Sequence, residues 1–124
     1  MRKQLSSSVN VRAELRLRVL RVLEKHPHFT QRQLASELNV SLGGVNYAVK
    51  ALIERGSVKV SNFRKSDNKV AYLYVLTARG VAEKTSLATA FLGRKLEEYE
   101  VLKQEIEDLK SEVGSGDSGK GGKS

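Results

Sequence analysis

The stretch from Thr30 to Leu76 constrains the fold of this chain most, because signals for two short helices, a tight turn and a hairpin follow one another there. Thr30 and Gln33 have the spacing of a capping box, in which each side chain satisfies a free backbone N–H group at the start of a helix. This pair predicts a helix over residues 31–38.

A second helix is predicted after a turn of three residues. Asn39, which tolerates left-handed backbone angles, ends the first helix, and Ser41 caps the second, over residues 42–55. Gly56 stands where glycine commonly ends a helix. A turn this short makes the two helices cross steeply.

The helix over residues 42–55 has two different faces. Its apolar positions recur at helical spacing and are predicted to face the core: Val45, Val49 and Leu52. The opposite side carries Gly43, Asn46, Tyr47 and Lys50.

Two short strands are predicted next. Val58 and Val60 alternate with polar residues, and Tyr72 and Tyr74 recur at the same spacing, as in half-buried strands whose tyrosines pack beside the core. Residues 64–69 between the strands form a polar, basic hairpin tip. The order of helix, turn, helix and hairpin is that of a winged helix-turn-helix, a fold whose second helix commonly enters the DNA major groove.

Helical patterns flank this region on both sides. Asn10 is predicted to cap a helix over residues 11–25, and Thr77 to cap a long helical region. The expected fold class is therefore mainly α with a small β-hairpin, a winged helix-turn-helix followed by a long C-terminal coiled-coil helix. The predicted divisions are a flexible N-terminus (1–9), the winged helix-turn-helix domain (10–76), a helical dimerisation segment (77–113) and a disordered Gly/Ser-rich tail (114–124).

The last helical region contains a heptad repeat. One core position holds Leu92, Tyr99, Ile106 and Val113, and the other holds Ala88, Lys95, Leu102 and Leu109. In a parallel pair Glu98 faces Lys103 of the other helix, whereas an antiparallel pair places like charges together. The repeat predicts a parallel homodimer through Leu92, Tyr99, Leu102, Ile106, Leu109 and Val113.

Positive charge is concentrated in the first part of the chain. Residues 1–76 contain 14 Lys and Arg against 5 Asp and Glu, whereas residues 77–124 contain 8 against 9. A basic region suits a polyanion such as nucleic acid, and a charge-balanced region suits association with another protein chain.

The residue types present argue against several classes of function. Without cysteine there can be no disulfide, thiolate metal site or thiol catalysis. No apolar run approaches the roughly 18 residues of a membrane span and the N-terminus lacks the apolar centre of a signal peptide, so we expect a cytoplasmic protein that binds no membrane. His26 and His28 have no acidic cluster nearby, and the chain lacks a Ser/His/Asp grouping and a Gly-rich phosphate loop. We therefore expect no enzymatic activity, metal site or cofactor.

A DNA-reading role assigns functions to the exposed side chains of the helix over residues 42–55. Asn46 can pair with the edge of adenine, Tyr47 can contact a methyl group or a phosphate, and Lys50 can reach phosphate or guanine. Free backbone amides at the start of this helix can hold a phosphate, and the residues there are Ser41, Gly43 and Gly44. Further contacts to the DNA backbone are predicted for Gln31, Arg32, Arg64, Lys65 and Lys69.

Each of these assignments has a structural alternative. Gly43 and Gly44 suit either a close approach to DNA or a crowded helix crossing. Arg32 and the basic hairpin tip suit either phosphate contact or an ordinary solvated surface. For the whole chain the alternative is a protein-interaction adaptor, in which the winged helix is a scaffold and the coiled coil recruits a different partner.

The run TQRQLASELNVSLGGVNYAVKALIERGSVKVSNF, followed by KVAYLYVLTARG, resembles the MarR-type winged-helix regulators of bacteria. The closer likeness is to a subgroup of MarR family EPS-associated transcriptional regulators, which accompany exopolysaccharide gene clusters. Four features in combination carry it: Gln-Leu-Ala in the first of the two helices, Val-Ser-Leu-Gly-x-Val-Asn-Tyr at the start of the next, Lys-Ala-Leu-Ile-Glu-x-Gly before the hairpin, and Phe-Leu-x-x-Lys-x-x-Glu-Tyr-Glu at residues 91–100. The likeness covers about residues 10–113 and implies a dimer that controls transcription on a two-fold operator in double-stranded DNA. It implies that Asn46, Tyr47 and Lys50 read the operator, with the hairpin as an auxiliary contact.

Larger MarR proteins carry flanking helices at both ends of the domain, which build the dimer and often a ligand pocket. This chain has little N-terminal sequence for such helices and has a coiled coil in their place. The resemblance therefore leaves the small-molecule effector unknown.

Overall fold

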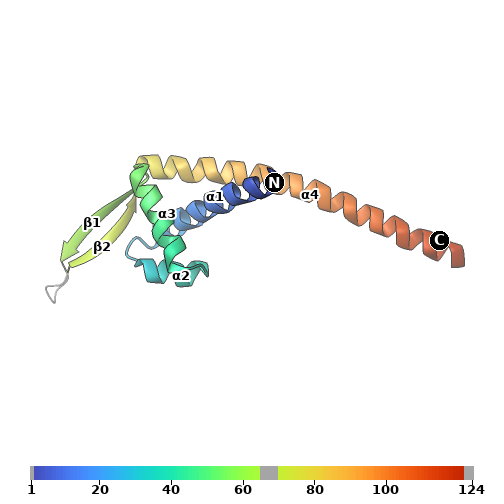
Figure 1. Ribbon diagram of the computed structural model, residues 1–124, viewed down its shortest axis with the longest axis horizontal. Helices are drawn as coiled ribbons and strands as arrows, with labels where there is room; N and C mark the ends of the chain where they lie inside the picture. The colour runs from blue at the N-terminus through green and yellow to red at the C-terminus, as the bar shows by residue number, and fades with distance from the viewer. Residues whose placement is uncertain (1, 65–69, 122–124) are drawn as a thin grey trace. The chain divides into compact units, whose positions relative to one another are not determined.

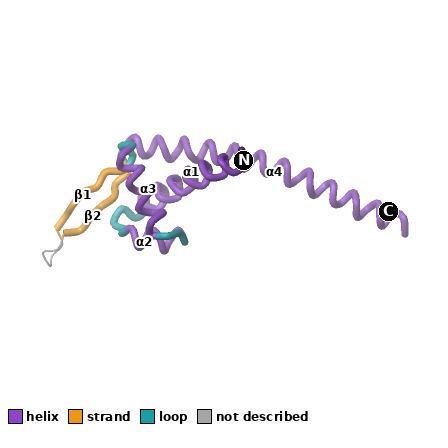
Figure 2. Tube along the Cα trace, viewed as in Figure 1, coloured by secondary structure: helices purple, strands orange, loops and turns teal. Residues whose placement is uncertain are grey.

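The computed structural model describes residues 2–64 and 70–121, with side chains placed for residues 10–62 and 72–115. The elements in chain order are α1 (Arg2–Lys25), α2 (Gln31–Leu38), α3 (Leu42–Glu54), β1 (Val58–Arg64), β2 (Val70–Leu76) and α4 (Ala78–Gly121) (Figure 1; Figure 2). The predicted fold class, mainly α with a small hairpin and a long last helix, is confirmed. The chain divides into two compact units, the first ending at Thr89 and the second starting at Ala90.

Helix α1 starts earlier than the sequence pattern predicts. It begins at Arg2, so the segment expected to be loose is helical and Asn10 lies inside the helix. No proline or glycine interrupts residues 2–25. Extending a helix adds one hydrogen bond for each residue that is ordered, so a helix that packing has already nucleated can continue through three serines of moderate propensity.

The predicted capping residues hold the starts of α2 and α3. Thr30 Oγ1 accepts a hydrogen bond from the Gln33 N–H at 3.1 Å, and Gln33 Oε1 accepts one from the Thr30 N–H at 2.8 Å, which completes the capping box. At the start of α3, Ser41 Oγ accepts a hydrogen bond from the Gly44 N–H at 3.0 Å. The predicted bounds of α2 and the predicted start of α3 are therefore confirmed.

Both helices end with the same arrangement of backbone hydrogen bonds. Asn39 has φ 58°, and the N–H groups of Asn39 and Val40 donate back into the last turn of α2. Gly56 has φ 77°, and it and Ser57 repeat this pattern after α3. A left-handed residue followed by two such bonds is a Schellman motif, which satisfies carbonyl groups that a helix end otherwise leaves free.

One apolar core joins the first three helices to the base of the hairpin. The predicted inner face of α3 is buried, and residues of α1, α2 and β1 complete the cluster: Val19, Leu20, Leu23, Leu34, Leu38, Val45, Ala48, Val49, Leu52 and Val58. Arg18 of α1 also donates through Nη2 to the Leu38 carbonyl oxygen at 2.6 Å, at the end of α2. These contacts fix α2 and α3 against α1 and leave their outer faces to solvent.

Strands β1 and β2 form an antiparallel hairpin in which Val58 pairs with Leu76 and Arg64 with Val70. Tyr74 packs against the core as predicted. Tyr72 does not, because 57% of its surface is exposed. The difference follows from distance, since Tyr74 lies nearer the base of the hairpin, where β2 contacts α1 and β1 contacts α3.

Helix α4 begins after Thr77, whose Oγ1 accepts a hydrogen bond from the Gly80 N–H at 3.0 Å. It is helical at Gly93 and continues to Gly121, so most of the tail predicted to be disordered is helical, and residues 122–124 lie outside the described part of the chain. None of the described helices is both long enough and apolar enough to cross a membrane.

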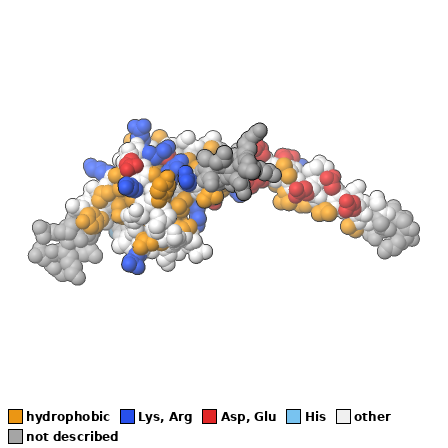
Figure 3. Space-filling view, viewed as in Figure 1, with side chains coloured by type: hydrophobic (Ala, Val, Ile, Leu, Met, Phe, Trp, Pro, Cys, Tyr) orange, Lys and Arg blue, Asp and Glu red, His pale blue; other side chains and the backbone are white. Residues whose placement is uncertain are grey.

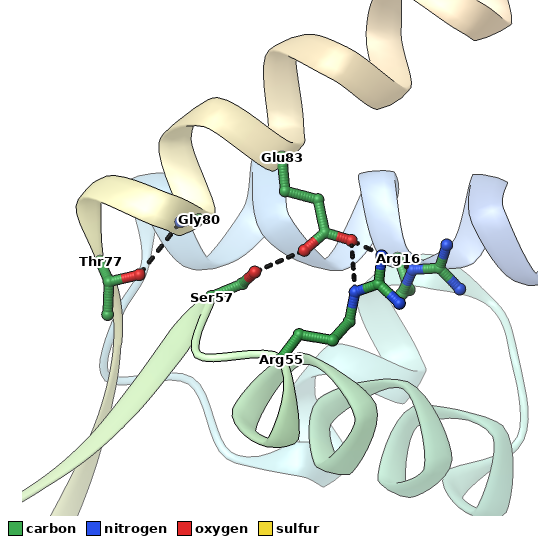
Figure 4. A network of polar contacts seen from close by, with 6 residues as sticks. All are labelled: Arg16, Arg55, Ser57, Thr77, Gly80 and Glu83. Atoms are coloured by element: carbon green, nitrogen blue, oxygen red, sulfur yellow. Dashed lines mark hydrogen bonds and ion pairs between the residues drawn. The ribbon is translucent and has the colours of Figure 1, made fainter.

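The first turns of α4 are joined to the base of the hairpin by a polar network around Glu83 (Figure 4). Glu83 Oε2 pairs with Arg55 Nε at 3.0 Å and with Arg16 Nε at 3.3 Å, and Ser57 Oγ donates to Glu83 Oε1. The Glu83 side chain is 11% exposed and Ser57 is fully buried. One carboxylate thus ties together α1, the end of α3, the start of β1 and the start of α4.

Gly80 allows this close packing. A Cβ atom built on Gly80 would lie 2.1 Å from the backbone oxygen of Ser57, a distance at which the backbone would have to move. Thr77 adds two bonds at the same junction, since its Oγ1 donates to the Gly56 carbonyl oxygen at 2.6 Å and its N–H donates to the Ser57 carbonyl oxygen at 3.0 Å. The first unit therefore includes the beginning of α4.

Candidate nucleic-acid interface

The outer face of α3 presents the side chains that the sequence assigned to base reading. Asn46, Tyr47 and Lys50 are all exposed, and Tyr47 has 58% of its surface accessible. The helix is held by its inner face, where Val45 and Val49 are fully buried. A helix anchored on one side and polar on the other can enter a groove without disturbing the core.

The start of α3 offers free backbone N–H groups, and its two glycines differ in their surroundings. A Cβ atom built on Gly43 would meet nothing within 4 Å among the described residues. A Cβ atom on Gly44 would lie 3.2 Å from Ser41 Oγ and 3.9 Å from Leu15 Cδ2. Crowding against the cap therefore accounts for Gly44, whereas no contact within the described chain accounts for Gly43.

Gln31 and Asn46 are joined across the two helices. Asn46 Nδ2 donates to Gln31 Oε1 at 3.2 Å, and Gln31 Nε2 donates to the Tyr74 hydroxyl oxygen at 3.3 Å. The sequence placed Gln31 on the DNA backbone, but both ends of its amide have partners inside the protein. Sequence patterns do not predict these hydrogen bonds, because the three residues lie on three different elements.

A hollow of about 720 Å³ lies at this junction of α2, α3 and β2. Its wall consists of Thr30, Gln31, Arg32, Leu42, Gly43, Asn46 and Tyr74. Arg32 is exposed at its edge, beside the start of α3. Of the predicted DNA-binding residues, the structure brings Gln31, Arg32, Gly43 and Asn46 onto one concave surface, whereas Ser41 and Gly44 at the α3 start do not line it.

Arg12 of α1 lies against the outer face of α3, although the sequence did not indicate it. Its guanidinium carbon lies 5.8 Å from the centroid of the Tyr47 ring, within the range of a cation–π contact. This contact holds a positive charge next to the outer face of α3. An exposed arginine on a separate helix carries no local signal that would have revealed its neighbour.

The predicted hairpin-tip contacts lie mostly outside the described residues. Arg64 is the last residue of β1, and its backbone pairs with Val70. Lys65 and Lys69 fall in the part of the chain that is not described. Their contact with DNA remains a prediction from the sequence.

The helix-turn-helix region resembles that of known DNA-binding proteins. Residues 12–59 match a family model described as winged helix-turn-helix DNA-binding. This match covers α2, α3 and most of α1, and so includes the two helices that line the hollow but not β2. Among proteins of curated function, none matches the chain at a significant level.

Solved structures share the fold over most of the chain. A mutant of ZitR from Lactococcus lactis in its apo form is 24% identical, with 91% of this chain and 83% of that chain covered and a TM-score of 0.55. The MarR family transcription regulator SP03579 is 14% identical, with 91% and 85% covered and a TM-score of 0.54. A MarR/EmrR family transcriptional regulator from Acinetobacter sp. ADP1 is 19% identical, with 81% and 75% covered and a TM-score of 0.50.

The fold is that of the MarR-type regulators. The resemblance to these regulators inferred from the sequence is therefore confirmed for the fold.

Beyond the MarR-type winged helix, the second unit carries an unpaired apolar stripe along α4. Between 43% and 64% of the surface of each predicted dimerisation residue is exposed: Leu92, Tyr99, Leu102, Ile106, Leu109 and Val113. Figure 3 shows apolar side chains in a row on this part of α4, with acidic side chains beside them. Leu96, which the heptad assignment left out of the core, borders the stripe and is 55% exposed.

Charged side chains in and beside the stripe make contacts within the same helix. Lys95 Nζ pairs with Glu98 Oε1 at 3.2 Å, and Lys103 Nζ lies 5.9 Å from the centroid of the Tyr99 ring. Both contacts are exposed, so they contribute little to the stability of the helix and can be exchanged for contacts with another chain at low cost.

The two histidines lie in the turn between α1 and α2 and do not line the hollow. The ring of His26 stacks on Phe29 with centroids 4.6 Å apart, and His28 meets Phe29 edge to face at 5.7 Å. Within the described residues, no group of three or more His, Cys, Asp or Glu side chains could hold a metal ion.

Proposed function

We propose that this chain is a transcriptional regulator that binds double-stranded DNA in a sequence-specific manner. The observation that carries the proposal is the outer face of α3, where Asn46, Tyr47 and Lys50 are exposed on a helix buried along its other side. The match of residues 12–59 to a DNA-binding winged helix-turn-helix model supports the same role. These side chains supply the donors, acceptors and charge that the edges of bases and phosphates require.

The start of α3 is the proposed phosphate contact. Gly43 has open space around it, so a DNA backbone can approach the free N–H groups there more closely than a side chain would permit. Arg12, beside Tyr47, and Arg32, at the edge of the hollow, add positive charge on either side. We propose that Arg64, Lys65 and Lys69 of the hairpin contact the adjacent DNA backbone.

We propose further that two copies pair through the apolar stripe of α4 and bind an operator of two-fold symmetry. A lone helix cannot bury this stripe, and an exposed apolar surface that recurs every seven residues suits a second, identical helix. In the parallel arrangement Glu98 faces Lys103 of the second copy and Glu105 faces Lys110. In the antiparallel arrangement glutamate would face glutamate.

The proposed target genes are those of exopolysaccharide production. This part of the proposal rests on the combined likeness of four motifs, including the run at residues 91–100, to the EPS-associated subgroup.

Selection of bound sequences from random DNA tests the DNA-binding proposal most directly. The native protein should select a palindromic motif, and Asn46→Ala should lose preference at one base pair in each half, at a cost of about 1 to 3 kcal/mol on the selected site. Lys65→Ala should instead weaken binding to all sequences alike and lower the slope of log affinity against log salt by about 1. Equal losses on selected and random DNA for both variants would contradict these roles.

The dimer is tested separately by sedimentation. A monomer at micromolar concentration, together with unchanged DNA affinity after removal of the residues that follow Gly93, would refute it. If the chain shows no salt-dependent DNA binding at all, the adaptor alternative is the better account.

A further inference from the structure

We propose that Gln31 and Tyr74 are positioning residues that make Asn46 select adenine over guanine. This inference rests on the proposed DNA-binding function. It assigns Gln31 a role different from the phosphate contact that the sequence suggested, and it gives Tyr74 of the hairpin a part in base selection.

The geometry that carries it is a chain of two hydrogen bonds. Asn46 Nδ2 donates to Gln31 Oε1 at 3.2 Å, and Gln31 Nε2 donates to the Tyr74 hydroxyl at 3.3 Å. The links cross from α3 to α2 and from α2 to β2. They therefore hold the exposed Asn46 side chain in one orientation before any DNA arrives.

Tyr74 is the fixed end of this chain. Its ring packs against the apolar core, and its backbone N–H donates to the Pro27 carbonyl oxygen at 2.9 Å. Gln31 is half-buried between this tyrosine and the outer face of α3. The core thus sets the orientation of Asn46 through Tyr74 and Gln31. Because the Asn46 side chain is already ordered, less conformational entropy is lost when DNA binds.

The hydrogen-bonding groups that Asn46 has left for DNA determine which base it prefers. A neutral amide has two N–H donors and an acceptor oxygen, and Asn46 gives one N–H to Gln31. One N–H and the oxygen are left for DNA. Adenine presents an acceptor and a donor in the major groove, which this pair matches, whereas guanine presents two acceptors, which need two donors.

The experiment uses the full-length protein and two kinds of variant. Selection from random DNA with native protein and with Asn46→Ala first identifies the base pair that Asn46 reads. Dissociation constants are then measured on duplexes that differ only there, with adenine or guanine. We expect native protein to prefer adenine by roughly 5- to 150-fold.

Gln31→Met keeps the length of the side chain but removes the acceptor, and it should reduce this ratio to within about threefold. Gln31→Glu offers only acceptors, so Asn46 keeps its orientation. This variant should bind all DNA more weakly because of its negative charge, yet retain the adenine preference.

Tyr74→Phe removes the outer anchor of Gln31 and should lower the ratio severalfold. Tyr72→Phe is the matched control, because Tyr72 lies on the same strand, is 57% exposed and is outside the hydrogen-bonded chain. It should leave the ratio unchanged. Thermal unfolding of each variant confirms that the ratios are compared between folded proteins.

The outcomes separate this inference from the proposed function. If the native protein selects a motif but Asn46 reads guanine, or Gln31→Met keeps the adenine preference, the positioning role is wrong while the regulator remains. If affinity falls equally on both duplexes in every variant, Gln31 is merely structural and the inference is again overturned. If the native protein selects no motif, the DNA-reading function fails and the inference fails with it.

Discussion

Gly43→Ala is the substitution that best separates folding from DNA binding in this chain. Glycine inside a helix costs about 0.5 to 1 kcal/mol relative to alanine, because its backbone loses more freedom on folding. Gly43 lies in the first turn of α3, and the described residues leave the space around its Cβ position open. Alanine should therefore raise the free energy of unfolding by about 0.5 to 1 kcal/mol.

Thermal unfolding measured by circular dichroism checks this value. In a unit the size of the one ending at Thr89, the gain corresponds to a rise in Tm of about 2 to 8 °C. Gly80→Ala is the matched control, since its Cβ would lie 2.1 Å from the Ser57 oxygen and should lower stability by about 1 to 3 kcal/mol. Protein concentration is held fixed, because dimerisation makes Tm depend on it.

The same Gly43→Ala change should weaken DNA binding by about tenfold, or about 1.4 kcal/mol, on selected and random sequences alike. The added methyl group would stand between the backbone amides of α3 and a phosphate. A variant that is more stable and binds DNA as tightly as the native protein would refute the close-approach argument. A variant that is less stable would refute the helix argument.

Three further predictions concern contacts elsewhere in the molecule. Glu83→Gln should lower the free energy of unfolding by about 1 to 3 kcal/mol in urea denaturation, because the buried Ser57 hydroxyl and two guanidinium groups lose a charged acceptor; an unchanged midpoint would contradict the role of the network. Glu105→Lys should weaken the dimer by about 1 kcal/mol in sedimentation equilibrium, and adding Lys110→Glu should restore it; a tighter dimer from the single change would exclude the parallel arrangement. Thr30→Ala should cost about 1 kcal/mol in thermal unfolding through loss of the capping box, whereas Thr30→Ser should be close to neutral.

The helix-turn-helix could be read from the sequence almost residue by residue. Its signals lie within three or four positions of each other, as in the Thr30 and Gln33 pair, the Ser41 cap and the left-handed Asn39 and Gly56. Local backbone hydrogen bonding sets these boundaries, and tertiary packing agrees with them. The predictions were less accurate at the outer ends of α1 and α4: α1 begins earlier than expected through a segment without proline or glycine, and α4 continues into the glycine-rich tail.

The candidate interface could be read only in part. Exposure of Asn46, Tyr47 and Lys50 follows from helical periodicity once the inner face is known. The contact of Tyr47 with Arg12 could not be predicted from periodicity, because Arg12 lies on another helix. Outside the interface, the sequence contains a weak signal for the ion-pair network of Glu83, because Glu83 is the single acidic residue between Asp67 and Glu97 and lies beside a basic region.

By itself, the sequence determined the order of the elements, the caps of α2 and α3 and the periodicity of the stripe on α4, because each depends on residues close together along the chain. Only the tertiary structure decided which distant groups meet. Gln31 reaches Tyr74 across 43 positions and Arg16 reaches Glu83 across 67. Such pairs leave no periodic trace, because the core places them side by side through the packing of α1, α2 and α3 as a whole.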